Sequence, residues 1–215
     1  SCIYPKFTKQ PIEEESLMDG FLESTNEFYA IAKIAGLKLC ESLRIQHNFD
    51  AISLMPTNLY GRGDNYDLKN GHVMAALIRK FIEAESNSHP QVICWGTGTP
   101  YREFLNVEDL AEAALFVLEK WDPRAKDAPL DKYGKPLTHL NVGTGEVISI
   151  DNLSKKIAKF TNYKGEIIWD KSKPDGTPKK QLNISKIKHL GWEAKINLDH
   201  GIKKTINEFK RKNCF

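Results

Sequence analysis

The sequence lacks the features that mark several classes of protein. None of its apolar runs approaches the roughly 18 residues that a membrane-spanning helix needs. Its four cysteines lie far apart and form no Cys-x-x-Cys pair, so we predict neither a metal site nor a disulfide framework. Its 31 basic and 28 acidic residues are mixed along most of the chain, which leaves little field to attract nucleic acid. We therefore expect a globular cytoplasmic protein that contacts neither membrane nor nucleic acid.

The sequence also lacks a glycine-rich phosphate-binding pattern of the form Gly-x-Gly-x-x-Gly or Gly-x-x-Gly-x-x-Gly. A dinucleotide-binding fold places this turn after its first strand. The chain opens on Ser1-Cys2-Ile3-Tyr4, which has no helix cap and no targeting character. If the chain comes from a dinucleotide enzyme, we expect the N-terminal half of its sheet to be missing.

Alternating helical and strand patterns predict an α/β fold. Ser24 and Glu27 have the spacing of a capping box, and apolar residues at helical spacing follow, which predicts a helix over 27–46. The apolar run 49–55, ended by Pro56, predicts a buried strand and then a loop over 57–61. The other expected elements are helices over 72–85, 107–121 (capped by Asn106), 149–161 (capped by Ser149), 184–190 and 198–210, strands over 91–95, 103–107, 140–142 and 166–169, and loops over 122–137 and 172–178.

Tyr29 and Lys33 are four residues apart on the first predicted helix, so their side chains share one face. A nearby cation favours the phenolate form of a tyrosine, which lets the phenol exchange a proton with a carbonyl or alcohol. Tyr-x-x-x-Lys is a weak pattern by itself, because a tyrosine that packs over a lysine stem gives the same spacing.

Six lysines gather between residues 171 and 188, at positions 171, 173, 179, 180, 186 and 188. This cluster is either a solvated face or a surface that contacts phosphate. The sequence does not decide between the two.

Five motifs, taken together and in this order, resemble those of the GDP-L-fucose synthases, NADPH-dependent epimerase-reductases of the extended short-chain dehydrogenase family. The likeness extends from Ser1 to about Phe209, and the motifs in combination are far more specific than any one of them. They are the segments 1–6 (SCIYPK), 27–33 (EFYAIAK), 55–61 (MPTNLYG), 95–104 (WGTGTPYREF) and 173–178 (KPDGTP).

The resemblance implies a catalytic role for four residues. Tyr29 would protonate the oxygen at carbon 4 of the sugar, and Lys33 would tune this tyrosine and hold the nicotinamide ribose. Cys2 and His72 would be the acid-base pair that epimerises carbons 3 and 5, where the adjacent keto group stabilises an enolate. A positive neighbour would favour the thiolate form of Cys2. Considered alone, a single cysteine or histidine would more often be structural.

The resemblance also implies binding residues. NADP(H) would contact Ser1, Tyr29, Lys33, His72 and the segment Pro56, Thr57, Asn58 and Leu59, with the catalytic serine expected just before Ser1. The nucleotide-sugar would contact Lys80, Trp95, Arg102 and Asp175. Position 80 is often arginine in the family, so a bidentate contact is expected to be lost here.

The implied fold is the C-terminal part of a Rossmann-like NAD(P)-binding domain, residues 1–61, and a smaller α/β substrate-binding domain, mainly residues 62–215, with later segments returning to the first. The implied partners are a GDP-sugar and a second subunit, paired through the Tyr-x-x-x-Lys helix. Two alternatives stay open. A nucleotide-sugar 4,6-dehydratase or 4-epimerase would share Tyr29 and Lys33, and a chain that only folds, dimerises or binds nucleotide-sugar would not turn over.

Overall fold

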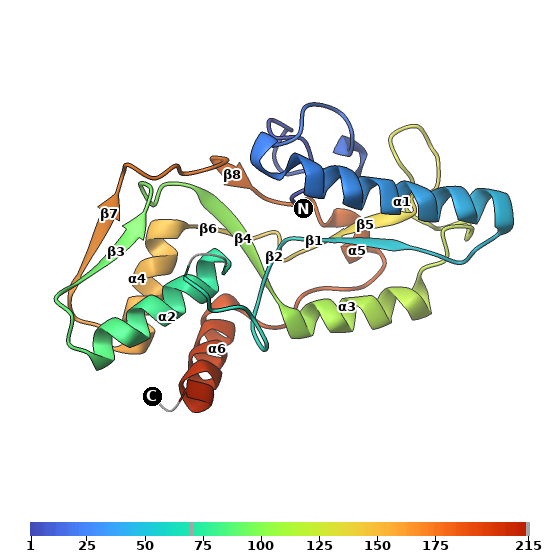
Figure 1. Ribbon diagram of the computed structural model, residues 1–215. Helices are drawn as coiled ribbons and strands as arrows, with labels where there is room; N and C mark the ends of the chain where they lie inside the picture. The colour runs from blue at the N-terminus through green and yellow to red at the C-terminus, as the bar shows by residue number, and fades with distance from the viewer. Residues whose placement is uncertain (69–70, 214–215) are drawn as a thin grey trace.

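The computed structural model describes residues 1–68 and 71–213 and confirms the α/β class (Figure 1). In chain order its elements are the short 3-10 helices η1 (Glu14–Ser16) and η2 (Ser24–Asn26), α1 (Glu27–His47), β1 (Ser53–Pro56), β2 (Asn58–Tyr60), α2 (Val73–Ser86), β3 (Gln91–Trp95), β4 (Tyr101–Asn106), α3 (Val107–Lys120), β5 (His139–Val142), β6 (Val147–Ser149), α4 (Ile150–Thr161), β7 (Glu166–Asp170), β8 (Lys179–Lys180), α5 (Ser185–His189) and α6 (Leu198–Asn213). Within these ranges no helix is both long and apolar enough to cross a bilayer.

The helices lie close to the predicted ranges, and two of the three predicted caps are confirmed. Asn106 accepts a hydrogen bond from the amide of Glu108, and Ser149 accepts one from the amide of Asn152. The capping box at Ser24 is wrong, because residues 24–26 form a 3-10 turn and α1 begins after Asn26. The Asn26 side chain instead donates to the Cys2 carbonyl, so a tertiary contact replaces the local cap.

The strand assignments need two corrections. Strand β1 begins at Ser53, not at residue 49, because Phe49 is exposed and the Ala51 carbonyl accepts a hydrogen bond from Arg44. Residues 58–60 form strand β2 and not a loop, since they pair in parallel with Phe104–Asn106 of β4. This pairing joins segments about 45 residues apart, so local sequence did not show it. Strands β6 and β8 were likewise not predicted.

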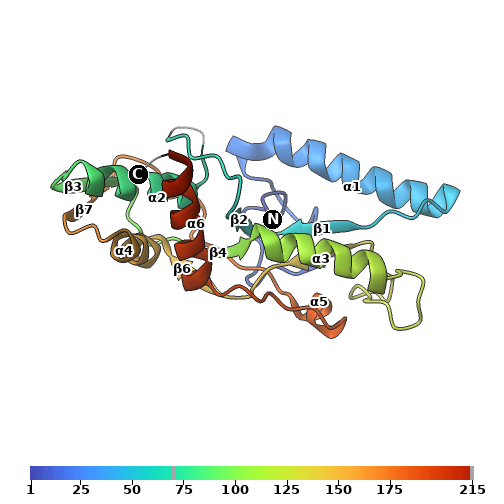
Figure 2. The same cartoon turned by 90° about the horizontal axis from the view of Figure 1, so that it is seen from below.

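Strand pairing is mostly parallel, as expected where helices connect strands. β1 pairs in parallel with β5, and β3 pairs in parallel with β7. β4 pairs in parallel with β2 and β8 and in antiparallel with β6. Figure 1 shows β1 and β5 between α1 on one side and α3 on the other, and Figure 2 shows the same arrangement for β1.

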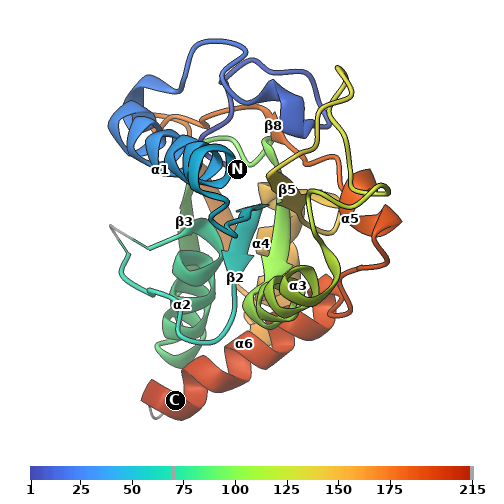
Figure 3. The same cartoon turned by 90° about the vertical axis from the view of Figure 1, so that its right-hand side faces the viewer.

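Two hydrophobic clusters divide the molecule. The first is formed by α1, β1, α3, β5 and α5, and the second by β2, α2, β3, α4 and α6. Strand β4 joins them, because Leu105 is buried in the first cluster and the neighbouring Phe104 in the second. Figure 3 shows α1 and α6 on opposite sides of the molecule. Residues after 62 therefore contribute to both clusters.

Candidate active site

A cavity of about 920 Å³ lies along α1, between it and the segments that follow β1 and precede α2. All the side chains predicted to be catalytic or to bind the cofactor line this cavity. They are Ser1, Cys2, Tyr29, Lys33, Pro56, Thr57, Asn58, Leu59 and His72. The structure thus brings together residues from four separate places in the sequence.

Tyr29 and Lys33 lie on the first turns of α1, on the face toward the cavity. The Lys33 ammonium is 5.6 Å from the centroid of the Tyr29 ring, and 53% of Tyr29 is exposed. The phenol is therefore accessible to a ligand and close to a fixed positive charge. Ala32, Gly36 and Cys40 continue this face along the cavity. We did not predict these three, although they follow Tyr29 at successive steps of three, four and four residues, which indicates the same face.

Cys2 is exposed and is held by its backbone, because its carbonyl accepts a hydrogen bond of 3.0 Å from the Asn26 side chain. The Lys180 ammonium lies 3.9 Å from the Cys2 sulfur. Lys180 thus places an ammonium group beside the exposed thiol. Lys180 was not predicted as a site residue, because strand β8 brings it to Cys2 from 178 positions away.

His72 precedes the first residue of α2, and its ring is exposed to the cavity. Its Nδ1 atom is 3.8 Å from a carboxylate oxygen of Asp64, whose side chain is only 13% exposed. This distance is longer than a hydrogen bond, so the Asp64 carboxylate lies beside the imidazole without a direct bond to it. Asp64 was missed by the sequence analysis.

The segment 56–59 is fixed by hydrogen bonds to β4. The side chains of Thr57 and Asn58 both donate to the Glu103 carbonyl, at 3.2 and 2.8 Å. The Glu103 carboxylate is fully buried and accepts hydrogen bonds from the amides of Thr144, Gly145 and Leu182. Burial raises the pKa of Glu103, and these three amides oppose the rise. The residue fixes three chain segments around the cavity.

A smaller cavity of about 190 Å³ brings together three of the four residues predicted to bind substrate, Trp95, Arg102 and Asp175. Val73 lines both this cavity and the larger one, so the two adjoin. Lys80, the fourth residue, is outside the lining but close to it, with its ammonium 5.7 Å from the Trp95 ring centroid. Burial lowers the pKa of Arg102.

Asp175 connects two loops. Its carboxylate oxygens accept hydrogen bonds from the Thr97 amide and the Thr97 hydroxyl, both at 2.7 Å, and these bonds lower the pKa of Asp175. Gly96 beside it has φ +81°, and a Cβ atom there would lie only 2.2 Å from the Asp175 carboxylate. In this structure Asp175 thus fixes the 172–178 loop against the turn after β3. Its predicted contact with substrate stays a prediction.

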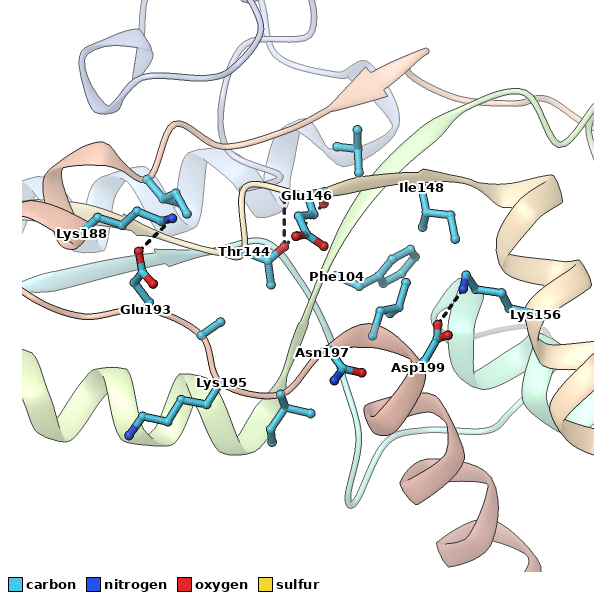
Figure 4. Close-up of a pocket in the computed structure, with 15 residues that line it drawn as sticks. Phe104, Thr144, Glu146, Ile148, Lys156, Lys188, Glu193, Lys195, Asn197 and Asp199 are labelled. Carbon is cyan, nitrogen blue, oxygen red and sulfur yellow. Dashed lines mark hydrogen bonds and ion pairs between the residues drawn. The ribbon is translucent and has the colours of Figure 1, made fainter.

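A third pocket, of about 610 Å³, is lined by residues of β4, β6, α4, α5 and the chain that leads into α6 (Figure 4). Phe104 lines both this pocket and the cavity along α1. The lysines around this pocket are neutralised by carboxylates: Lys156 by Asp199 at 2.7 Å, Lys188 by Glu193 at 3.0 Å, and Lys195 by Glu112. It therefore offers a phosphate less positive charge than the cavity beside Trp95. Among the residues that the structure describes, no group of three or more His, Cys, Asp and Glu side chains could hold a metal ion.

Comparisons with known proteins agree with the motifs. Residues 1–130 match the model of the NAD dependent epimerase/dehydratase family. The chain is 49% identical to a probable GDP-L-fucose synthase of Oryza sativa subsp. japonica over 205 residues, which are 95% of this chain and 58% of the relative. It is also 49% identical to the GDP-L-fucose synthase of Escherichia coli (strain K12) over 209 residues, 97% of this chain and 64% of the relative.

A solved structure is similar throughout. The NADP-bound GDP-L-fucose synthetase of Naegleria fowleri matches with a TM-score of 0.84 and 26% identity, over 99% of this chain and 64% of that chain. The chain thus spans about three fifths of the length of these proteins. The resemblance predicted from the motifs is confirmed, and the chain belongs to the NAD dependent epimerase/dehydratase family.

Proposed function

We propose that the site along α1 is that of a GDP-L-fucose synthase, which epimerises carbons 3 and 5 of GDP-4-keto-6-deoxy-D-mannose and reduces carbon 4 with NADPH. The observation that supports this proposal is the position of Cys2, Tyr29, Lys33 and His72 on one cavity. The named relatives at 49% identity point to the same reaction.

Different residues serve the two halves of the reaction. Cys2, beside Lys180, and His72, beside Asp64, exchange the protons at carbons 3 and 5, which the neighbouring keto group makes acidic. The Tyr29 phenol gives its proton to the oxygen at carbon 4, and Lys33 holds a positive charge close to the phenolate that forms. The epimerisation therefore needs no residue outside this chain for its acid and base.

The cavity fits the nicotinamide end of NADPH. Its walls are the half-exposed Tyr29 ring, the Lys33 ammonium and the backbone of 56–59, which β4 holds in place through Thr57 and Asn58. When bound, the cofactor supplies a hydride to carbon 4. Lys33 would contact its ribose, and the C-terminal end of β1 would face its ring.

Solvent exchange tests the proposal in this chain, because it needs no hydride. The chain is incubated with GDP-4-keto-6-deoxy-D-mannose in D₂O, and the deuterium at carbons 3 and 5 is measured by NMR. We expect exchange in the wild type and in Tyr29→Phe, and at least a hundredfold slower exchange in Cys2→Ala. NADPH is then added to follow the reduction, which Tyr29→Phe should slow. A product that keeps mannose stereochemistry at carbons 3 and 5 would contradict the proposal and favour a 4,6-dehydratase or 4-epimerase.

The second candidate function is binding of the nucleotide-sugar without catalysis. It is favoured by the absence of a glycine-rich phosphate-binding turn from these 215 residues. Titration with NADPH, followed by fluorescence, separates this candidate from the first. Binding of GDP without NADPH binding or exchange would favour it.

We also infer a two-domain organisation that follows the two hydrophobic clusters, in which residues 105–142 and 182–194 return to the domain of α1.

A homodimer through α1 is supported by its exposed apolar side chains, Phe28, Ile31, Leu39 and Ile45. Sedimentation of the wild type and of Phe28→Asp tests it, since the charge should shift the chain toward monomer. The free Cys2 thiol must stay reduced for the proposed reaction, and the cytoplasm provides that condition.

A further inference from the structure

Two lysines, not one, flank the exposed Trp95 ring. The ammonium of Lys80, from α2, and the ammonium of Lys173, from the 172–178 loop, each lie 5.7 Å from its centroid. Trp95 itself is 58% exposed. The ring therefore orders two positive charges from distant parts of the chain beside the small cavity that Arg102 lines.

The position of Lys173 is fixed by its loop. Asp175, two residues later, accepts both of its hydrogen bonds from Thr97, which places the loop on the turn that follows Trp95. The close approach of this carboxylate to Gly96 leaves no room for a side chain between the two loops. Lys173 is thus held beside the cavity by the backbone, while its long side chain stays exposed.

Lys173 differs from Lys186 and Lys188 of the lysine-rich region 171–188 in what its charge contacts. Lys186 is neutralised by Glu14 and Glu15, and Lys188 by Glu193. In the described part of the chain, no ion pair joins Lys173 to a carboxylate. The amide and hydroxyl of Ser172 donate to Asp170 and are the main reasons that its pKa is lowered, and the more distant charge of Lys173 adds to that lowering.

We propose that Lys173, together with Lys80 and Arg102, binds the diphosphate of the nucleotide-sugar. This inference rests on the proposed function. The Lys80 ammonium is also fixed by a hydrogen bond of 2.9 Å to the Ile93 carbonyl, whereas the Lys173 ammonium has the ring as its close contact. An ammonium-phosphate hydrogen bond is stronger than this ring contact, so the diphosphate draws Lys173 from the ring. A lysine at position 80 offers a phosphate a single charged group without the two-point contact of an arginine, and Lys173 adds a second ammonium on the other loop.

Calorimetric titration of the 215-residue chain with GDP tests the proposal. Lys173→Ala should raise the dissociation constant of GDP about tenfold, the loss of one charged phosphate contact, and should make the affinity less sensitive to NaCl. Lys173→Arg should stay within about threefold of wild type, because the charge is kept. Lys171→Ala is the matched control, since it removes an exposed lysine of the same loop, and its affinity should equal that of wild type.

The outcomes distinguish this inference from the proposed function. If Trp95→Ala and Arg102→Ala weaken GDP binding but Lys173→Ala behaves like Lys171→Ala, the site stands and the role of Lys173 is wrong. If the wild type does not bind GDP, or if Trp95→Ala and Arg102→Ala bind it as the wild type does, the proposed site fails and the inference with it. Circular dichroism of each variant confirms that its fold is unchanged.

Discussion

Replacing Asn141 by alanine should be among the most destabilising single changes in the first hydrophobic cluster. Asn141 lies on β5 and is fully buried. Its side-chain oxygen accepts a hydrogen bond of 2.6 Å from the Tyr4 hydroxyl, and its side-chain nitrogen donates to the carbonyls of Ile12 and Asn183 at 2.9 and 3.2 Å. One amide thus ties the N-terminal segment, which bears Cys2, to β5 and to the chain before α5.

The magnitude follows from the groups left without partners. Asn141→Ala removes the partner of the buried Tyr4 hydroxyl and of the Asn183 carbonyl, and each such group costs about 1–3 kcal/mol. The Ile12 carbonyl keeps its hydrogen bond from the Asn183 amide. We expect a loss of about 2–6 kcal/mol, a large share of the roughly 5–15 kcal/mol that stabilises a typical domain. Tyr4→Phe removes the hydroxyl donor alone and should cost about 1–2 kcal/mol.

Urea unfolding followed by circular dichroism measures both changes. Because the two variants lose the same hydrogen bond, the double variant should be less destabilised than the sum of the single ones. Asn152→Ala is the control, since this exposed side chain should change stability by less than about 0.5 kcal/mol. A loss below about 1 kcal/mol for Asn141→Ala, or strict additivity with Tyr4→Phe, would refute this account of the hydrogen bonds.

Three further changes test other parts of the structure. Burial lowers the pKa of His139 below its usual 6.5, so protonation favours the unfolded chain. The free energy of unfolding in urea should therefore fall as the pH drops below about 6.5. His139→Gln should flatten that part of the pH profile. Gly96→Ala should lower GDP affinity in calorimetry without unfolding the chain, because the added methyl displaces Asp175; unchanged affinity would show that the loop contact is unnecessary. Leu153→Ala, in the fully buried face of α4, should cost about 2–5 kcal/mol in thermal unfolding, and a smaller loss would mean that the second cluster is loosely packed.

The sequence was most informative where structure is local. The caps at Asn106 and Ser149 and the apolar spacing of α2 and α4 each depend on residues within a few positions of one another, so they were predicted correctly. β2 was missed because its hydrogen bonds go to β4, and nothing within 57–61 itself distinguishes a short paired strand from a turn. The same reason explains the wrong cap at Ser24, since Asn26 bonds to Cys2.

The site shows the same limit. The family motifs named residues that the structure indeed places on one cavity, and Trp95, Arg102 and Asp175 on the next. Lys180 and Lys173 were visible only as members of a lysine-rich region. In the structure Lys180 lies beside the Cys2 thiol and Lys173 beside the Trp95 indole ring. These contacts join positions about 80 to 180 residues apart in the sequence, so local patterns do not reveal them.

Phe104 couples two surfaces that are otherwise built from different elements. Its ring lines both the cavity of the proposed acid-base pair and the 610 Å³ pocket, and only a small part of it is exposed. A substitution at this position would therefore change the wall of both spaces at once, so the two cannot be altered independently through this residue.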